Sequence, residues 1–479
     1  TERARYVRPP DGKSAEMAAP RPGVFMGLPA LLGPLVARIG VSATMLKGAV
    51  WSIGGTAVGA AASFITQIVL ARSLEATRYG VYSYLLAWVN VAVLVGKLEF
   101  DNIAVRFVGA YEGQRQDGLL HGFLRYGWRI VAGTATGVAL VAGLTAWLLR
   151  RHLHAGIEGG IWTAALLVPL SALLLFSSSA LQGLRQIPQA QLPQLVLRPV
   201  LFGVAIVLTG SGLGLHLGAG SAVALNATAT AGALAVSLVL LGRAVPASVV
   251  AAAPRLDPAT WRRAVGGFLV ISAAQLVLSA QADILVVGTL LGLRLAGVYS
   301  VASQLATLIS LGAAAVMFVV LPAIADLHAR GRRAELQRLV VRTVQACAVV
   351  SIPVAVPLLA AGHAVLRAYG ATFADAYPVL IVLGGVQLVG ATFGGISGYL
   401  LTMTGHEWEA SRVIVGTALL NLALTFMLTP TFGIVGAALA TAAAGLTRQE
   451  LLRRRVRRYV GVSVLPYFPP TEGRMAGGA

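Results

Sequence analysis

The amino-acid sequence predicts an all-α integral membrane protein of about twelve transmembrane helices, arranged as two six-helix bundles related by a parallel internal repeat. Three observations lead to this fold class. Of the 479 residues, 57% are hydrophobic and only 11% are charged, whereas soluble domains carry about 25% charged residues. The apolar residues form runs of about twenty, long enough to cross ~30 Å of hydrocarbon. A short motif also occurs twice, at equivalent places in the two halves.

Twelve apolar runs lie between charged or Pro/Gly-rich gaps. The first six are 48–71, 80–105, 123–149, 161–184, 192–210 and 219–242, and the second six are 265–290, 297–321, 338–361, 377–402, 412–429 and 433–447. The expected parts of the chain are a basic cytoplasmic N-terminal tail with room for an interfacial segment (1–46), an N-terminal six-helix bundle (47–243), a cytoplasmic linker (244–264), a C-terminal six-helix bundle (265–447) and a basic cytoplasmic C-terminal tail (448–479).

The distribution of arginine predicts the orientation. Loops after even-numbered runs carry about fifteen arginines, and loops after odd-numbered runs carry about six. Because short cytoplasmic loops are enriched in Lys and Arg, the even-numbered loops and both termini are expected on the cytoplasmic side of a bacterial inner (plasma) membrane, crossed many times. Anionic membrane lipids as partners then account for the net charge of +19. Nucleic acid is not an expected partner.

The internal repeat aligns residues 74–83 with residues 291–300 at a constant offset of 217, and both copies contain Gly-Val-Tyr-Ser. A weaker echo at an offset of 215 matches Gly218, Ala222 and Ala227 with Gly433, Ala437 and Ala442. Since six helices per half is an even number, both halves enter the membrane in the same direction. The repeat axis is therefore expected to lie along the membrane normal, as in membrane proteins built from parallel repeats.

A series of short segments occurs along the chain in a characteristic order: Lys47-Gly48-Ala49-Val50-Trp51, 69–74, Gly80-Val81-Tyr82-Ser83, 283–288, 297–302, Ala368-Tyr369-Gly370 with Phe373, Met403-Thr404-Gly405-His406, Asn421 and 429–438. In their order and placement these segments resemble the polysaccharide-transporter (oligosaccharide flippase) branch of the multidrug, oligosaccharidyl-lipid and polysaccharide (MOP) exporter superfamily. The resemblance implies two six-helix bundles around a cavity that opens alternately to each side. It also implies a flippase that moves undecaprenyl-diphosphate-linked oligosaccharide units across the inner membrane for O-antigen, capsule or exopolysaccharide biosynthesis. A polyprenyl-diphosphate-linked oligosaccharide is thus the expected substrate, polysaccharide polymerase machinery an expected partner, and a monomer the expected state.

Charged residues inside apolar runs are the first candidates for function, because they are costly in hydrocarbon. Asp283 resembles an acidic residue of the family and is expected to bind H⁺ or Na⁺; the alternative is an ion pair with an arginine that joins the halves. Arg198 precedes Pro199 and could bind phosphate through its guanidinium fork. If the helix begins only after Pro199, Arg198 instead extends to the membrane surface.

Uncharged polar residues inside the runs are further candidates for the translocation cavity. They are Gln275, Gln67, Asn90 and Asn226. Lys97, Glu99 and Asp101 are a candidate cytoplasmic gate, although Lys97 and Asp101 could merely neutralise each other at a spacing of four.

Two other functions remain open from the sequence. One is a cation-coupled multidrug exporter of the same superfamily, and the other is a membrane-embedded lipid-dependent glycosyltransferase or ligase. Enzymes of the latter kind need catalytic groups on sizeable external loops, and the loops here are short. We therefore expect no enzymatic activity, no catalytic or metal-binding residues and no cofactor beyond the H⁺ or Na⁺ that couples transport.

Overall fold

The computed structural model describes residues 43–149, 157–209 and 217–464. The expected N-terminal tail as far as residue 42, and the end of the expected C-terminal tail from residue 465, lie outside the described residues. The described residues from Lys47 onward belong to one compact unit. Every regular element in the described ranges is helical.

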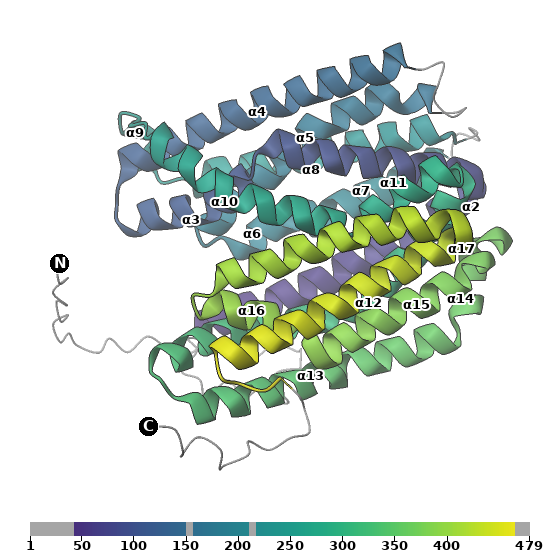
Figure 1. Ribbon diagram of the computed structural model, residues 1–479. Helices are drawn as coiled ribbons and strands as arrows, with labels where there is room; N and C mark the ends of the chain where they lie inside the picture. The colour runs from purple at the N-terminus through teal and green to yellow at the C-terminus, as the bar shows by residue number, and fades with distance from the viewer. Residues whose placement is uncertain (1–42, 150–156, 210–216, 465–479) are drawn as a thin grey trace, which may run out of the picture. The chain divides into compact units, whose positions relative to one another are not determined.

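The elements of the first half run from α2 to α8. They are α2 (Ala43–Lys97), α3 (Phe100–Gly113), α4 (Asp117–Leu148), η2 (Glu158–Gly160), α5 (Ile161–Gly183), α6 (Ile187–Gln191), η3 (Leu192–Leu197), α7 (Arg198–Val207) and α8 (Ala219–Ala244). In this half α5 packs between α4 and α8, and α3 packs along α5 (Figure 1).

The second half follows a short connecting helix, α9. Its elements are α9 (Ala247–Ala251), α10 (Pro258–Val277), α11 (Ala280–Leu290), α12 (Leu293–Ala329), α13 (Arg333–Ala360), α14 (Gly362–Tyr369), η5 (Ala371–Ala376), α15 (Tyr377–Val389), η6 (Gly390–Gly394), α16 (Ile396–Met403) and α17 (Glu407–Tyr459). Here α12 packs against α13 and α15, and α17 packs against α15 and α16 (Figure 1).

Within the described ranges, nine helices are long and apolar enough to cross a membrane. Two of them hold two spans each, because the backbone turns inside α2 at Glu75 and inside α17 at Gly433. The interrupted pair α10 and α11 supplies one more. All twelve expected runs thus coincide with helices, and the all-α membrane fold is confirmed.

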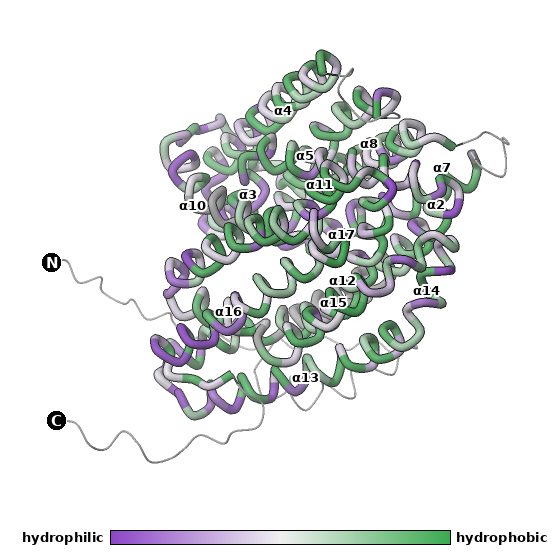
Figure 2. The backbone as a smooth tube through the Cα atoms, turned by 45° about the vertical axis from the view of Figure 1, so that its right-hand side comes forward, coloured by the Kyte–Doolittle hydropathy of each residue, from purple (hydrophilic) through white to green (hydrophobic). Residues whose placement is uncertain are grey.

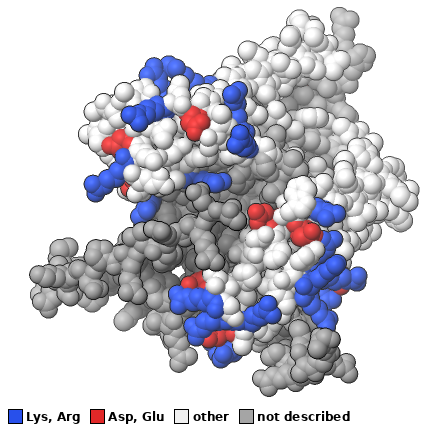
Figure 3. Space-filling view, turned by 60° about the vertical axis from the view of Figure 1, so that its left-hand side comes forward, with Lys and Arg blue, Asp and Glu red and all other residues white. Residues whose placement is uncertain are grey.

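Hydrophobic residues fill the middle of the helices, and hydrophilic residues lie mostly at their ends (Figure 2). Lys and Arg gather at one end of the helices (Figure 3), which we call the basic end. Its exposed members include Arg115, Arg255, Arg262, Arg330, Arg332 and Arg412. The basic end contains the loops predicted to be cytoplasmic, and the orientation itself stays a prediction.

The seventh span is shared between the halves. At the basic end, α10 packs on the first half, where Trp261 Nε1 donates to Tyr111 OH at 3.0 Å. The backbone N–H of Arg255 also donates to the carbonyl of Gly118 at 2.8 Å. The helix breaks after Leu278, Ser279 caps α11, and α11 then packs on α12 and α17. Because α10 also packs along α17, the first part of this span contacts both halves, whereas the second part packs on the second half.

The repeat is visible in the backbone of the turns that precede its two tyrosine motifs. Gly292, between α11 and α12, has φ 95° and ψ 162°. Glu75, the equivalent residue at the offset of 217, has φ 60° and ψ 169°. Only glycine adopts this region without strain, which costs an L residue about 1–3 kcal/mol. The first half therefore makes with a glutamate the turn that the second half makes with a glycine.

Exchanging these two residue types should change stability in opposite directions. Glu75→Gly is expected to raise the unfolding free energy by about 1 kcal/mol, because it removes the strain at an exposed position. Gly292→Glu should lower it by a similar amount. Thermal unfolding of the detergent-purified variants measures both. A Glu75→Gly variant less stable than the parent would show that the turn is not strained.

Candidate translocation site

The two halves meet where the two copies of the repeated motif cross. A Cβ added to Gly80 of α2 would lie 1.8 Å from the carbonyl oxygen of Leu293 in α12. A Cβ added to Gly297 would lie 2.8 Å from the Cα of Gly80. Because side chains cannot fit at these distances, the helices touch backbone to backbone. The repeated glycines are therefore contact points between the halves.

Polar and aromatic contacts surround this crossing. Tyr79 OH donates to Gln67 Oε1 at 3.0 Å and accepts from Gln304 Nε2 of the second half at 3.3 Å. The Tyr79 ring also meets Phe373 edge-on, with 5.6 Å between ring centroids. These contacts place the predicted cavity residue Gln67 in the bonded interface between the halves.

The segment formed by α14 and η5 covers α2 at the end opposite the basic end. Tyr369 packs edge-on against Phe64, with 6.0 Å between ring centroids. Arg72 Nε of α2 donates to the carbonyl of Ala368 at 2.6 Å. Tyr369 and Phe373 are both 1% exposed. The halves are therefore packed together at this end by buried aromatic rings.

A cationic network lies inside the first half. Arg198 Nη2 donates to Asn226 Oδ1 at 3.1 Å, and Asn226 Nδ2 donates to Tyr82 OH at 2.9 Å. Asn226 is 4% exposed and Tyr82 is 1% exposed. The sequence prediction named Arg198 and Asn226 separately, and the structure brings them together. Tyr82 was missed, although the repeat had marked it.

The local sequence explains why Arg198 has its position. Pro199 has no N–H, so the carbonyl of Leu195 loses its usual helical donor. The backbone widens into the π-helix η3 directly before Arg198. Gly59 of α2 packs against this turn so closely that a Cβ there would lie 2.0 Å from the oxygen of Leu195. Arg198 is the first residue of α7 and lies near the middle of the candidate span Ile187–Val207.

An anionic network lies at the matching place in the second half. Asp283 Oδ2 accepts from Tyr299 OH and from Thr441 Oγ1, both at 2.6 Å. Thr441 Oγ1 also lies 3.3 Å from Asn421 Oδ1. Asp283 is 1% exposed, and its Oδ1 has no hydrogen-bond partner among the described residues. Thr425 Oγ1 of the same helix as Asn421 is likewise buried without a hydrogen-bond partner in that part of the chain.

The partners of Asp283 are therefore neutral hydroxyl groups. None of the ion pairs formed by the described residues includes Asp283. Tyr299, Asn421, Thr425 and Thr441 surround the carboxylate with oxygen atoms, a donor type that suits hard cations.

The two networks are related by the repeat. Tyr82 and Tyr299 differ by the offset of 217, and Asn226 and Thr441 differ by the offset of 215. In the first half Tyr82 bonds Asn226 of the sixth helix directly, whereas in the second half Tyr299 and Thr441 of the sixth helix both donate to Asp283. In the first half the network ends on a guanidinium, and in the second it ends on a carboxylate. The same scaffold thus holds opposite charges in its two halves.

A third polar cluster lies nearer the basic end, between α2 and α3. Lys97 Nζ lies 3.0 Å from Glu99 Oε1 and 2.8 Å from Asp101 Oδ2. Ser272 of α10 donates to Glu99 Oε2 at 2.9 Å. Leu98 and Glu99 both have positive φ, 46° and 58°, so the second span is interrupted here. The candidate gate residues therefore connect the first half to α10.

Two predicted cavity residues lie apart from these clusters. Asn90 and Gln275 are both exposed on their helices, α2 and α10. From the sequence they resembled Asn226, since all three are amides inside apolar runs. The repeat was the signal that distinguishes them, because only Asn226 has a counterpart in the second polar network.

Comparison with solved structures places this fold in a known class. A multidrug resistance MATE family transporter of the MOP superfamily, in an inward-facing conformation, matches 87% of this chain and 99% of its own at a TM-score of 0.65 and 14% identity. The lipid II flippase MurJ, inward closed, matches 85% and 87% at 0.62 and 15% identity. A MOP superfamily transporter from Pyrococcus furiosus matches 86% and 95% at 0.59 and 12% identity. The fold is that of the MOP superfamily transporters.

The family follows from the sequence itself. The model of the polysaccharide biosynthesis protein family matches residues 45–328, more than half of the chain, and the protein belongs to this family. No curated protein matches the sequence. The resemblance noted from the motifs is therefore confirmed at the level of family and fold.

The glycine contact between the halves can be tested by adding one carbon atom. Gly80→Ala should lower the unfolding free energy by about 1–3 kcal/mol, because α2 and α12 must separate to admit a methyl group. Gly133→Ala in α4 is the control, since a Cβ there meets nothing within 4 Å. Thermal unfolding of both variants gives the comparison. Equal stability of Gly80→Ala and Gly133→Ala would contradict a direct backbone contact.

Proposed function

We propose that the protein is a flippase that translocates polyprenyl-diphosphate-linked oligosaccharides across the bacterial inner membrane by alternating access. Membership of the polysaccharide biosynthesis family and the MOP fold support a transporter as the class. The lipid-linked substrate is proposed from the charge arrangement of the site. The polymerase machinery that extends such oligosaccharides is the proposed partner.

The observation that carries the substrate proposal is the guanidinium of Arg198. It lies within a membrane span, where a charge is costly unless it is used. Its one hydrogen bond to a described side chain goes to the neutral Asn226, and none of the ion pairs of the described residues includes it. A guanidinium has five N–H donors. Those not used by Asn226 suit the oxygens of a diphosphate, which arginine binds in pairs.

Asp283 is the proposed coupling site for H⁺ or Na⁺. Its Oδ1 and Thr425 Oγ1 are buried without hydrogen-bond partners in the described part of the chain. Together with Asn421 Oδ1 and Thr441 Oγ1 they offer oxygen ligands from α11 and both limbs of α17. A cation there, or a proton on the carboxylate, would neutralise the charge and tie these helices together.

Lys97, Glu99 and Asp101 are the proposed cytoplasmic gate. Ser272 of α10 donates a hydrogen bond to Glu99, so α10 is bonded to the first half near the basic end. Opening at that end requires α10 to move with one half or the other. For α10 to leave the first half, the Glu99 to Ser272 contact must break together with the Trp261 to Tyr111 bond. The strained backbone at Leu98 and Glu99 favours such a change.

A cation-coupled multidrug exporter is the competing function, since its fold would be the same. An exporter of cationic drugs would gain from an acidic site and would be opposed by the unpaired Arg198. Removal of the positive charge of Arg198 should therefore impair a lipid flippase but not an exporter of cationic drugs.

Arg198→Gln should lower the rate of lipid flipping by tenfold or more, about the loss expected for one charged hydrogen bond to the diphosphate. Arg198→Lys should restore part of the rate, because an ammonium keeps the charge but not the fork. The measurement is translocation of a fluorescent polyprenyl-diphosphate oligosaccharide in proteoliposomes. Arg243→Gln, at an exposed arginine of α8, is the matched control. An unchanged rate in Arg198→Gln, or faster efflux of cationic dyes, would favour the exporter.

Asp283→Asn should abolish the stimulation of flipping by an imposed H⁺ or Na⁺ gradient, because the amide cannot carry the charge that the cation balances. Membrane abundance and thermal unfolding should stay close to the parent, since the amide keeps the size and can still accept from Tyr299 and Thr441. Asp375→Asn, an exposed acid at 3.9 Å from Arg294, is the control. Full gradient-driven flipping in Asp283→Asn would refute the coupling role.

A further inference from the structure

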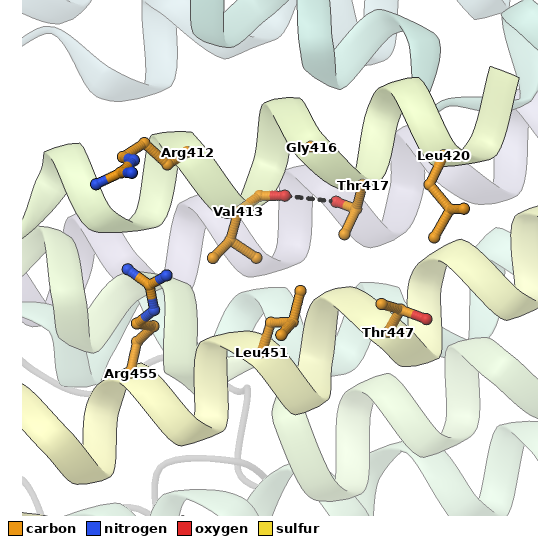
Figure 4. A pocket seen from close by; sticks show the side chains of 8 residues that line it. All are labelled: Arg412, Val413, Gly416, Thr417, Leu420, Thr447, Leu451 and Arg455. Atoms are coloured by element: carbon orange, nitrogen blue, oxygen red, sulfur yellow. Dashed lines mark hydrogen bonds between the residues drawn. The ribbon is translucent and has the colours of Figure 1, made fainter. Parts of the chain in front are cut away.

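The two limbs of α17 form a groove at the basic end. They turn at Gly433 and run antiparallel, so Arg412 of one limb lies opposite Arg455 of the other (Figure 4). The groove between them has a volume of about 400 Å³. Both guanidinium groups lie at the same end of the groove, with Arg455 extending toward the first limb, and apolar side chains follow along both limbs (Figure 4).

The charge at this end of the groove is positive. Glu409 pairs with both arginines: its Oε1 lies 3.6 Å from Arg412 Nη1, and its Oε2 contacts Arg455 Nη1. Two cations and one anion leave a net charge of +1. The Arg412 side chain is 61% exposed, so its N–H donors are accessible to a ligand.

The rest of the groove is suited to a hydrocarbon chain. Val413 and Leu420 line the groove from one limb and Leu451 lines it from the other. Leu420 is 36% exposed and Leu451 is 37% exposed. The hydroxyl of Thr417 is occupied, because it donates to the carbonyl of Val413 at 2.8 Å (Figure 4). At Gly416 an added Cβ would meet nothing within 4 Å. The groove is therefore open along its length.

We propose that this groove binds one anionic phospholipid, with its phosphate on the exposed N–H donors of Arg412 and Arg455 that Glu409 does not use, and one acyl chain along Val413, Leu420 and Leu451. Basic pockets between membrane helices bind anionic headgroups in this way. Leu420 lies eight positions after Arg412, a rise of about 12 Å along the helix, which is most of one leaflet of a ~30 Å hydrocarbon core. The net charge of +1 matches a phosphodiester with a single negative charge better than a diphosphate.

The bound lipid would act on the proposed coupling site from a distance. Asn421 lies on the first limb just beyond Leu420, and Thr441 lies on the second limb, and the two are 3.3 Å apart across the hairpin. A lipid that bridges Arg412 and Arg455 fixes the spacing of the same two limbs. The lipid site does not depend on what the protein transports. The lipid proposal can therefore be refuted while the proposed function holds, and the proposed function can be refuted while the lipid proposal holds.

The proposal is tested by titrating the full-length, delipidated protein with phosphatidylglycerol and measuring binding by native mass spectrometry. Phosphatidylcholine is the neutral probe. The parent should prefer phosphatidylglycerol. Arg412→Gln removes an exposed charge, and Gly416→Leu fills the groove; each should weaken phosphatidylglycerol binding by about tenfold. The matched controls are Arg342→Gln, an exposed arginine of α13, and Gly137→Leu, a position in α4 that is open in the same way.

Each other outcome counts against the proposal. Equal binding of the two lipids, or no difference between the groove variants and their controls, would exclude a phospholipid site. Loss of binding in Arg412→Gln alone, with Gly416→Leu unchanged, would leave a surface charge effect and refute the acyl-chain groove. Displacement of phosphatidylglycerol by stoichiometric polyprenyl diphosphate in the parent, but not in Arg412→Gln, would assign the groove to the transported lipid instead.

Discussion

The backbone contact between Gly80 and Gly297 is the constraint on which the rest of the site depends. Because neither residue has a side chain, α2 and α12 approach more closely than any other residue type would permit. Each glycine is followed two residues later by a tyrosine, and a helix turns by about 200° over that distance. Tyr82 and Tyr299 must therefore point away from the contact, each into its own half. The crossing thus sets the position of both polar networks at once.

The separation of charge between the halves has a simple energetic meaning. A buried arginine and a buried aspartate in direct contact would neutralise each other, and neither would be free to bind a ligand. Here each charge is held by neutral partners, Asn226 for Arg198 and the hydroxyls of Tyr299 and Thr441 for Asp283. Both charges stay unpaired within the protein, and each is positioned by a helix that belongs to the contact between the halves.

The sequence predicted the spans well and the site only in part. The length of the apolar runs and the placement of arginine depend only on the lipid bilayer and the water on either side of it, so all twelve runs could be located from the sequence. Partners such as Ser272 of Glu99 depend on α10 packing against the first half as well as against α17, which no local pattern shows. Asn90 and Asn226 could not be told apart by composition, since both are amides inside apolar runs; the repeat and the packing distinguish them. The break at Leu278 likewise follows from neighbours distant in sequence, whereas Pro199 is a local signal for the π-helix before Arg198.

The break in the seventh span has a thermodynamic consequence. Its basic-end part, α10, is held by the first half through Trp261 and Ser272, whereas α11 carries Asp283 in the second. Asn421 donates to the carbonyl of Val277 directly before the break. Any rotation of one half against the other must change the angle at this point. If a ligand binds Asp283 more tightly at one angle between α10 and α11, its binding must stabilise that angle by the same free energy. Ligand binding at the carboxylate and the tilt of α10 are therefore thermodynamically coupled.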